Sequence, residues 1–407
     1  MRRRHRPLLL LAATALLLAL FALPGGTADR SASRNLLRNP GFEQGLEGHA
    51  WMPAAWDTFE SGLNTVFFGR DSFLVHGGQY SVNIANLSTN MPMFHNWSQT
   101  LAVGRELWDK DLTFSVWTRS NGLDGRAYIL LQAYRDTIQK MALQWGVPRD
   151  TALFRMGYTP TGQPTVLTGW RRHFFSERET EWVQRQVKVY VPAGTNIVYV
   201  RCGMLGTGQV MFDEASLTAT PAAMPPSAPL NKNLLADGGF EDAGNGWDYS
   251  LPPFPGLRIE RDSTIAHSGR ASLICTGGRA PFQARAGVCQ VLDARPFWGK
   301  RLRLSGWVRT DSLIGQAFIK LYGEKTEGPL EAPAAKQYGA TTPWTRTTIE
   351  MDVPPGTNVV SGWFIYNCPV EGRLWYDDCT LEVIGTAEYI LKKQPAPTSL
   401  PLPDPAP

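Results

Sequence analysis

Histidine and paired acidic residues carry much of enzyme chemistry, and in this chain neither forms a catalytic pattern. The six His form no H-E-x-x-H motif, and the chain has no G-x-S-x-G elbow, P-loop or dinucleotide fingerprint. Asp377 and Asp378 suggest a glycosidase pair, but successive strand residues point to opposite faces, whereas such enzymes need two carboxyls across a cleft. His76 and His267 lie beside or near glycine in turn-like blocks, which favours a conformational role. The motifs predict a protein that is not an enzyme.

Aromatic rings that share a strand face with polar side chains form a different pattern, suited to stacking on a ligand while hydrogen-bonding it. Alternation over 127–135 and 196–204 separates such a face from an apolar one, and the second half of the chain repeats the pattern. The residues on these faces are Tyr128, Gln132, Tyr134, Tyr199 and Arg201, with Phe318, Lys320, Tyr322 and Trp363 in the second half. Counting back from the match between Asp213 and Asp377 pairs Tyr199 with Trp363.

The cysteines are too few for a disulfide scaffold. The five lie at positions 202, 275, 289, 368 and 379, and no pair has the C-x-x-C spacing of a zinc site. A hairpin over 271–293 would place Cys275 opposite Cys289, which makes these two the best candidate for a disulfide. The other three are predicted to be small core residues.

Composition and charge exclude several classes of protein. The chain has 407 residues, which predicts two or three domains, and its 39 Gly and 30 Pro exceed what a helical protein carries. Hydrophobic residues, at 43%, provide enough apolar area for real cores. The net charge of +4 falls to zero without the segment 1–28, which holds four Arg and no acid. Nucleic-acid binding therefore lacks its electrostatic footprint.

The N-terminal segment, 1–28, has the pattern of an export signal. A basic run at 2–6 precedes an apolar stretch at 8–23 and small residues at 26–28. We expect cleavage after Ala28 and an extracellular or cell-surface location, with no membrane association afterwards. The alternative is an uncleaved anchor, because the apolar run approaches the ~17 residues at the lower limit of a membrane span.

The chain contains an internal duplication. NLLRNPGFE at 35–43 returns as NLLADGGFE at 233–241, HGGQYSV at 76–82 as HSGRASL at 267–273, and SVWTR at 115–119 as SGWVR at 305–309. VPAGTN at 191–196 returns as VPPGTN at 353–358, and FDEASL at 212–217 as YDDCTL at 376–381. Three Trp that recur in equivalent places are expected in the cores: Trp108, Trp117 and Trp182, matching Trp298, Trp307 and Trp344. Blocks in the same order indicate two homologous domains.

The duplication sets the expected boundaries. They are a first copy at 35–220, a Pro-rich linker at 221–232, a second copy at 233–386 and a disordered Pro-rich tail at 387–407. Each copy has a complete set of blocks, so each should fold by itself. The first copy is longer by an insertion at about 135–180, because the offset between matching residues falls from 190 at Gln132 to 162 at Trp182. For this insertion, both a tolerated surface loop and a functional one stay open.

Short alternating runs between Gly and Pro turns predict the fold class. We expect an all-β protein with two tandem antiparallel β-sandwich (jelly-roll) domains.

The opening, middle and closing blocks of both copies resemble the carbohydrate-binding modules of families 4, 9 and 22. These are galactose-binding-like jelly rolls that commonly accompany cellulases and xylanases. The resemblance implies a glycan partner and a sugar-binding groove on a concave sheet face, so the aromatic and polar faces become the sugar-binding candidates. It also implies one structural calcium ion (Ca2+) per copy, at Glu43 with Asp213 and at Glu241 with Asp377, since carboxylate oxygens suit calcium. The alternative is that each Asp caps a turn and each Glu bonds backbone amides.

The sequence therefore predicts an exported, non-catalytic protein that binds polysaccharide through tandem jelly-roll modules. Two alternatives stay open: a structural or adhesive cell-envelope protein that uses the same folds for protein contacts, and, less favoured, a glycan-active hydrolase. Neither the sugar nor the oligomeric state follows from the residues.

Overall fold

The computed structural model describes residues 34–59, 66–87, 94–156, 164–169, 171–175, 180–242, 246–250, 257–276, 285–333 and 335–391. The predicted export signal and most of the Pro-rich tail lie outside these ranges. In the described part of the chain, no helix is long and apolar enough to cross a membrane.

Antiparallel strands dominate the first copy. Its elements are β1 (Gly45–Leu46), β2 (His49–Pro53), β3 (Asp57–Phe59), β4 (Val66–Asp71), β5 (Ser81–Asn86), β6 (Phe94–Ala102), η1 (Arg105–Leu107), β7 (Lys110–Arg135), α1 (Thr137–Trp145), α2 (Arg149–Arg155), β8 (Thr165–Val166), β9 (Arg171–Phe175), β10 (Val183–Val191) and β11 (Ile197–Pro221). The main sheet runs in the order β10-β7-β11-β5-β4, with β6 also on β11 and with β8 and β9 on β7.

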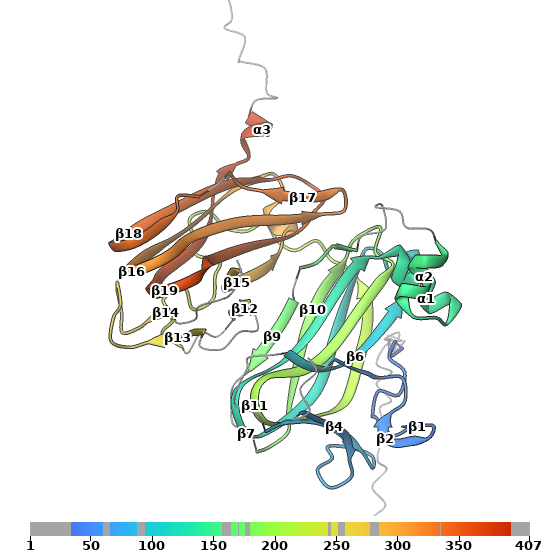
Figure 1. Ribbon diagram of the computed structural model, residues 1–407. Coiled ribbons are helices and arrows are strands. Elements are labelled where there is room, and N and C mark those ends of the chain that lie inside the picture. Colours follow the sequence, from blue (N-terminus) through green and yellow to red (C-terminus); the bar gives the residue numbers. More distant parts are fainter. Residues whose placement is uncertain are drawn as a thin grey trace, which may run out of the picture. The chain divides into compact units, whose positions relative to one another are not determined.

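The second copy repeats this plan. Its elements are β12 (Asp248–Ser250), β13 (Arg258–Asp262), β14 (Ser272–Thr276), β15 (Arg285–Asp293), η3 (Arg295–Phe297), β16 (Lys300–Lys325), β17 (Gly328–Glu331), β18 (Tyr338–Val353), β19 (Thr357–Thr386) and α3 (Glu388–Leu391). The strand order is β12-β15-β19-β14-β13, and β16 pairs with β17, β18 and β19. Figure 1 shows β16 and β19 as long strands that run through the whole copy. The predicted all-β, double jelly-roll fold is confirmed.

Long bent strands build both layers of each sandwich. In the first copy, one half of β7 pairs with β10 and the end of β11, and the other half pairs with β9 and the start of β11. The bend lies where the ladder slips beside Gly206 and Gly208, which have φ values of +110° and +105°. A Cβ at Gly206 would lie 2.3 Å from the carbonyl oxygen of Asp124, so only glycine fits this turn of the chain.

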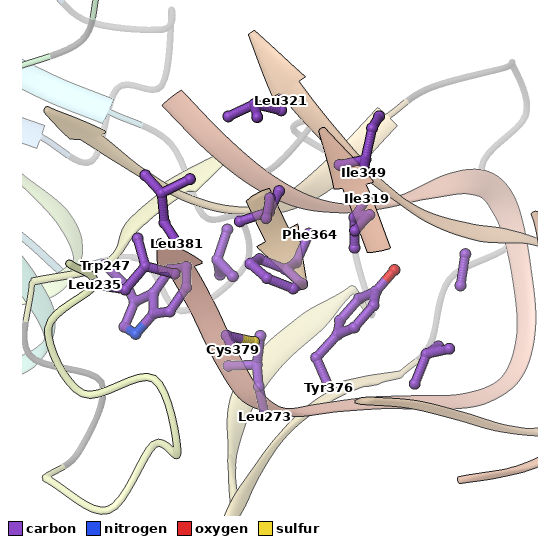
Figure 2. Close-up of a cluster of buried hydrophobic side chains, with 14 of the residues drawn as sticks. Leu235, Trp247, Leu273, Ile319, Leu321, Ile349, Phe364, Tyr376, Cys379 and Leu381 are labelled. Atoms are coloured by element: carbon purple, nitrogen blue, oxygen red, sulfur yellow. The ribbon is translucent and has the colours of Figure 1, made fainter. Parts of the chain in front are cut away.

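Each sandwich has its own apolar core, and alternate residues of the long strands contribute side chains to it. In the second copy Ile319 and Leu321 of β16 lie in one buried cluster with Phe364 and Leu381 of β19 (Figure 2). Tyr376 is fully buried there, and its hydroxyl donates to the carbonyl oxygen of Ile365 at 2.7 Å, so this ring packs without leaving an unpaired polar atom. The first copy has an equivalent core that includes Ile129 and Leu131 of β7.

The predicted hairpin between Cys275 and Cys289 does not form. Cys275 lies on β14 and Cys289 on β15, and both strands pair with β19 but with different parts of it. Both thiols are free and buried, and burial raises their pKa values. The candidate disulfide was wrong because the segment between these cysteines connects two strands that are not neighbours.

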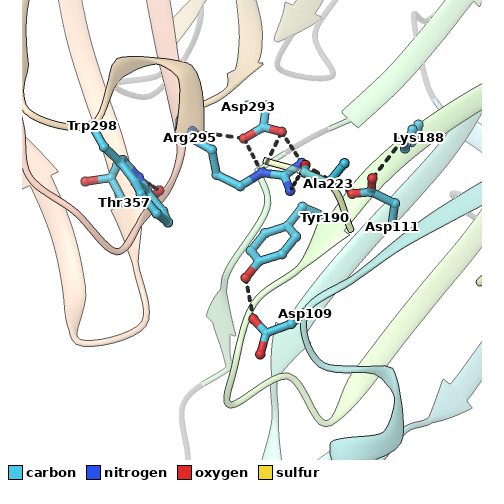
Figure 3. Close-up of polar contacts among 9 residues, drawn as sticks. All are labelled: Asp109, Asp111, Lys188, Tyr190, Ala223, Asp293, Arg295, Trp298 and Thr357. Carbon is cyan, nitrogen blue, oxygen red and sulfur yellow. Dashed lines mark hydrogen bonds and ion pairs between the residues drawn. The ribbon is translucent and has the colours of Figure 1, made fainter. Parts of the chain in front are cut away.

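Arg295 of η3 contacts the segment between the two copies and residues of both copies (Figure 3). Its guanidinium pairs with Asp293, donates to the carbonyl oxygen of Ala223, and lies 3.3 Å from Asp111, with the Tyr190 ring 4.1 Å away. The side chain is 7% exposed, so these partners compensate a buried charge. From Asn35 on, the described residues belong to one compact unit, and separate folding of the copies stays a prediction.

Candidate functional site

A groove on the second copy brings together three of the residues predicted from sequence. Lys320, Tyr322 and Trp363 line a cavity of about 380 Å³. The other lining residues are Arg285, Ala286, Glu331 and Ile365.

Alternation along β16 and β19 places these side chains. Ile319 and Leu321 point into the core. Lys320 lies between them and Tyr322 follows Leu321, so these two side chains point to the opposite side of the sheet. Trp363 is the ladder neighbour of Lys320, and directly paired residues project from the same face of a sheet. Phe318 lies on this face too and is half-buried, but it does not line the groove.

The polar groups of the groove are held in place. Lys320 Nζ pairs with Glu331 Oε1 at 3.0 Å and lies 5.1 Å from the centre of the Tyr322 ring. Trp363 Nε1 donates to Ser361 Oγ at 2.8 Å, which fixes the indole ring. Burial, followed by the charges of Glu324 and Glu331, raises the pKa of Tyr322, so its phenol stays neutral at ordinary pH. The groove offers two ring faces with charged hydrogen-bonding groups at their edges.

The equivalent face of the first copy is covered. Tyr128 is 2% exposed and Gln132 is fully buried. The Tyr128 ring packs against Phe94 and Phe174 at centroid distances of 5.5 and 5.7 Å, with the Arg172 guanidinium at 5.7 Å. Gln132 Nε2 donates to the carbonyl oxygen of Gly169. The prediction that Tyr128 and Gln132 lie on the solvent side of their strand was therefore wrong.

The insertion of the first copy supplies this cover. Its residues form α1, α2, β8 and β9, and β9 pairs with residues 127–131 of β7. Asp136 caps α1 by accepting from the backbone N–H of Gln139, and Gly146 ends the helix at φ +62°. The insertion therefore packs on the first copy, and the two interpretations left open for it, a tolerated surface loop and a functional one, are not separated by these contacts.

The remaining candidates of the first copy form a small cluster. Tyr134 and Tyr199 meet edge to face at 5.1 Å, and the Arg201 guanidinium lies 5.2 Å from the centre of the Tyr199 ring. All three side chains are half-buried. Burial raises the pKa of Tyr134 to about 12, despite the opposing charge of Arg201. Part of the predicted face thus stays accessible.

The ladder corrects the pairing of Tyr199 with Trp363. Leu130 and Lys320 occupy equivalent positions of β7 and β16, and their ladder partners are Arg201 and Trp363. Trp363 therefore corresponds to Arg201. Counting back from Asp377 failed because the second copy has two more residues between this strand position and the closing block.

Trp117 and Trp307, expected in the cores, lie on the outer faces of their strands. Val116 and Val308 take the core positions beside them. The His76 ring stacks on Trp117 at 3.8 Å, and His267 stacks on Trp307 at the same distance. Trp182 and Trp344 meet these His rings edge-on, at 5.9 and 5.7 Å. Trp108 and Trp298, by contrast, pack against the cores as expected.

The four carboxylates expected at calcium sites accept backbone N–H groups. Asp213 Oδ2 accepts from His76 and Gly77 at 2.8 and 3.1 Å, and Glu43 accepts from Gln79 and Tyr80. In the second copy, Asp377 and Glu241 repeat the arrangement with 267–268 and 270–271. Among the described residues, no three His, Cys, Asp or Glu side chains form a metal-ligand group. These are the contacts that the capping alternative describes, and calcium at these four carboxylates stays a prediction.

Sequence reasoning missed four lining residues, of which two are charged, Arg285 and Glu331. Glu331 lies on β17, directly opposite Tyr322 in the ladder. The turn signal ending at Gly328 was available in the sequence and would have placed this acid beside the ring. Arg285 begins β15, and the sequence before it has no pattern that locates the start of a strand.

No protein-family model matches the chain, and no curated protein matches it. Among solved structures, the CBM22-1–CBM22-2 tandem domain of Paenibacillus barcinonensis Xyn10C is similar at 15% identity and a TM-score of 0.30, over 87% of this chain and 98% of that one. The C-terminal family 22 carbohydrate-binding module of Clostridium thermocellum Xyn10B is similar at 17% identity and a TM-score of 0.31, over 40% and 99%. TmCBM61, solved with β-1,4-galactotriose, is similar at 16% identity and a TM-score of 0.29, over 46% and 100%. At these values the function must be argued from the groove itself.

Proposed function

We propose that this chain is an exported, non-catalytic glycan-binding protein whose binding groove lies on the second copy. The observation that carries the proposal is the convergence of Lys320, Tyr322 and Trp363 on one groove of about 380 Å³. These residues come from two different strands. Their convergence therefore depends on the ladder register as well as on alternation.

The groove has the chemistry that a sugar requires. A sugar ring presents a face of C–H groups, which packs on an aromatic ring, and a rim of hydroxyls, which needs donors and acceptors. Trp363 and Tyr322 supply the rings, and the Lys320–Glu331 pair supplies both a donor and an acceptor at their edge. Because the indole N–H is already bonded to Ser361, the ring is preorganised rather than free to turn.

Binding of the secreted form of the full chain to a panel of plant and bacterial polysaccharides tests the proposal. Replacing Trp363 by Ala should weaken binding by roughly two- to tenfold or more, since aromatic contacts contribute ~0.5 to 1.5 kcal/mol beyond area burial. The matched control is Trp51→Ala, because Trp51 is 58% exposed on β2 of the first copy, away from the groove.

Two outcomes would count against the proposal. If no glycan binds, the second interpretation, a structural or adhesive cell-envelope protein, gains support, and capture of a protein partner would replace the panel. If Trp51→Ala weakens glycan binding while Trp363→Ala does not, the protein binds sugar at another surface.

Export and calcium are separate parts of the proposal. The basic run and apolar stretch of the segment 1–28 support export, and sequencing the N-terminus of the secreted protein tests cleavage after Ala28. Calcium at Glu43 with Asp213, and at Glu241 with Asp377, is implied by the family resemblance alone. Calcium titration of a chelator-treated sample, followed by thermal melting, decides whether it binds.

A further inference from the structure

The charges of the groove are not balanced. Arg285 and Lys320 are its two cations, and Glu331 is its one acid. Lys320 uses that acid, at 3.0 Å. Among the described residues, no carboxylate pairs with Arg285, whose side chain is exposed at the start of β15. Among the described residues that line the groove, Arg285 therefore adds a positive charge that no acid balances, although the part of the chain after Ala28 has no net charge.

We propose that the groove selects carboxylated glycans, that is, polysaccharides containing uronic acids, and that Arg285 binds the carboxylate. This rests on the proposed function and narrows its substrate class. A guanidinium binds a carboxylate through two parallel N–H bonds, a geometry that a neutral hydroxyl cannot reproduce. Lys320 is held by Glu331 over the Tyr322 ring, so it serves the hydroxyls at that edge while Arg285 takes the charge.

The spacing leaves room for more than one sugar. Arg285 and Trp363 lie on neighbouring strands, and the ladder pairs Trp363 with Cys289, four residues along β15 from Arg285. At ~3.3 Å per residue along a strand and ~4.8 Å between strands, the two backbone positions are about 14 Å apart. One sugar can stack on Trp363 while a neighbouring residue of the same polymer presents its carboxylate to Arg285.

The first copy shows what this position holds when the face is closed. Arg285 pairs with Asn367, and the equivalent ladder position of the first copy pairs Phe94 with Leu205. Phe94 packs on Tyr128 under the insertion. Thus the same position carries an apolar ring under a cover in one copy and an exposed guanidinium at an open groove in the other.

The test compares one polymer with its neutral derivative. The secreted full chain is titrated calorimetrically with glucuronoxylan and with polygalacturonate, each before and after chemical reduction of its carboxyls to alcohols. We expect tighter binding of the carboxylated form of at least one polymer, and a preference that weakens with added salt. Arg285→Gln should lower affinity for that form by about tenfold, because hydrogen bonds to charged groups contribute ~1.5 to 3 kcal/mol.

Arg258→Gln is the matched control. Arg258 is an exposed arginine of the same copy, on β13, and its loss makes the same change in charge away from the groove. Equal affinity of the unaltered chain for native and reduced polymers would overturn the inference while leaving glycan binding intact. An equal loss in Arg285→Gln and Arg258→Gln would also overturn it, since the effect would then be one of net charge. Absence of binding to every polymer would overturn both the inference and the proposed function.

Discussion

The two copies present the same sheet face in two different states. On the second copy, the face around Trp363 and Tyr322 is an open groove. On the first copy, the insertion lies along β7 and buries Tyr128 and Gln132. The difference shows that a repeated fold need not repeat its surface, because the cores are equivalent while the faces are not.

Other features are shared closely by both copies. His76 and His267 stack on equivalent Trp rings and bond acids at 2.6 Å, and the buried Asp213 and Asp377 accept equivalent amide bonds. Because both copies have these ring contacts and hydrogen bonds, the contacts fit a role in holding the turn that carries each His. The groove is open in the second copy while the same face is covered in the first, which fits a role that the fold itself does not need.

The largest expected effect comes from the equivalent rings Tyr128 and Phe318. Tyr128→Ala should lower the free energy of unfolding by about 3 to 5 kcal/mol, as for other buried rings, because it leaves a cavity under the insertion. Phe318→Ala should cost clearly less, since this ring is half-buried on the open face. Denaturant unfolding measures both. Equal losses of unfolding free energy would mean that the two faces are covered alike, and the contrast drawn here between the two copies would be wrong.

The shared turns should respond equally in the two copies. Asp213→Ala and Asp377→Ala each leave three backbone N–H groups without an acceptor, so each should cost about 1 to 3 kcal/mol. Thermal melting in the presence of a chelator isolates the hydrogen-bonding part of the effect. A loss that appears only when calcium is supplied would instead establish the metal site.

Glu324 should make stability depend on pH. This residue occupies the position equivalent to Tyr134, accepts from the backbone N–H of Gly169 in the insertion, and has its pKa raised by burial to about 7, above the ordinary value of 4.5. Between these two values the folded chain binds more protons than the unfolded chain, so stability falls as pH rises through this window. Glu324→Gln should remove that part of the slope. Melting temperatures of the unaltered chain and of Glu324→Gln, measured at pH 5.5 and pH 8, give the pH dependence of stability for each protein. An equal pH dependence in the two proteins would contradict the prediction.

The smallest effect is expected from the aromatic cluster of the first copy. Tyr134→Ala should change glycan affinity of the full chain by less than about twofold, because stacking of this size belongs to the open groove of the second copy. Calorimetric titration with the best-bound polymer measures it. A loss as large as that of Trp363→Ala would show that the first copy binds glycan despite the insertion.

The fold class and which residues of β16 share a face could be predicted from the sequence because both depend on local alternation, and the duplication could be predicted because its motifs recur in the same order. Lys320 and Tyr322 reach the groove for this reason. The cover over Tyr128 and Gln132 could not be predicted, since alternation identifies which residues share a face but not what packs on that face. The pairing of Trp363 failed for a related reason: it depends on the length of a bend, which motif matching across the closing block does not measure.

The two additional residues between Trp363 and Asp377 have a consequence for how such a protein diversifies. Because side chains alternate with a period of two, an even change in length slides a strand by whole repeats and leaves every inward residue inward. An odd change would move the core side chains of the strand to its outer face, and selection would eliminate such a variant. The block at 191–196 and Arg201 keep the same offset of 162 to their counterparts at 353–358 and Trp363, so the two additional residues lie after this position. The exchange of an arginine for an indole is therefore a substitution, and the bend that follows can change its length by two residues while the interior is untouched.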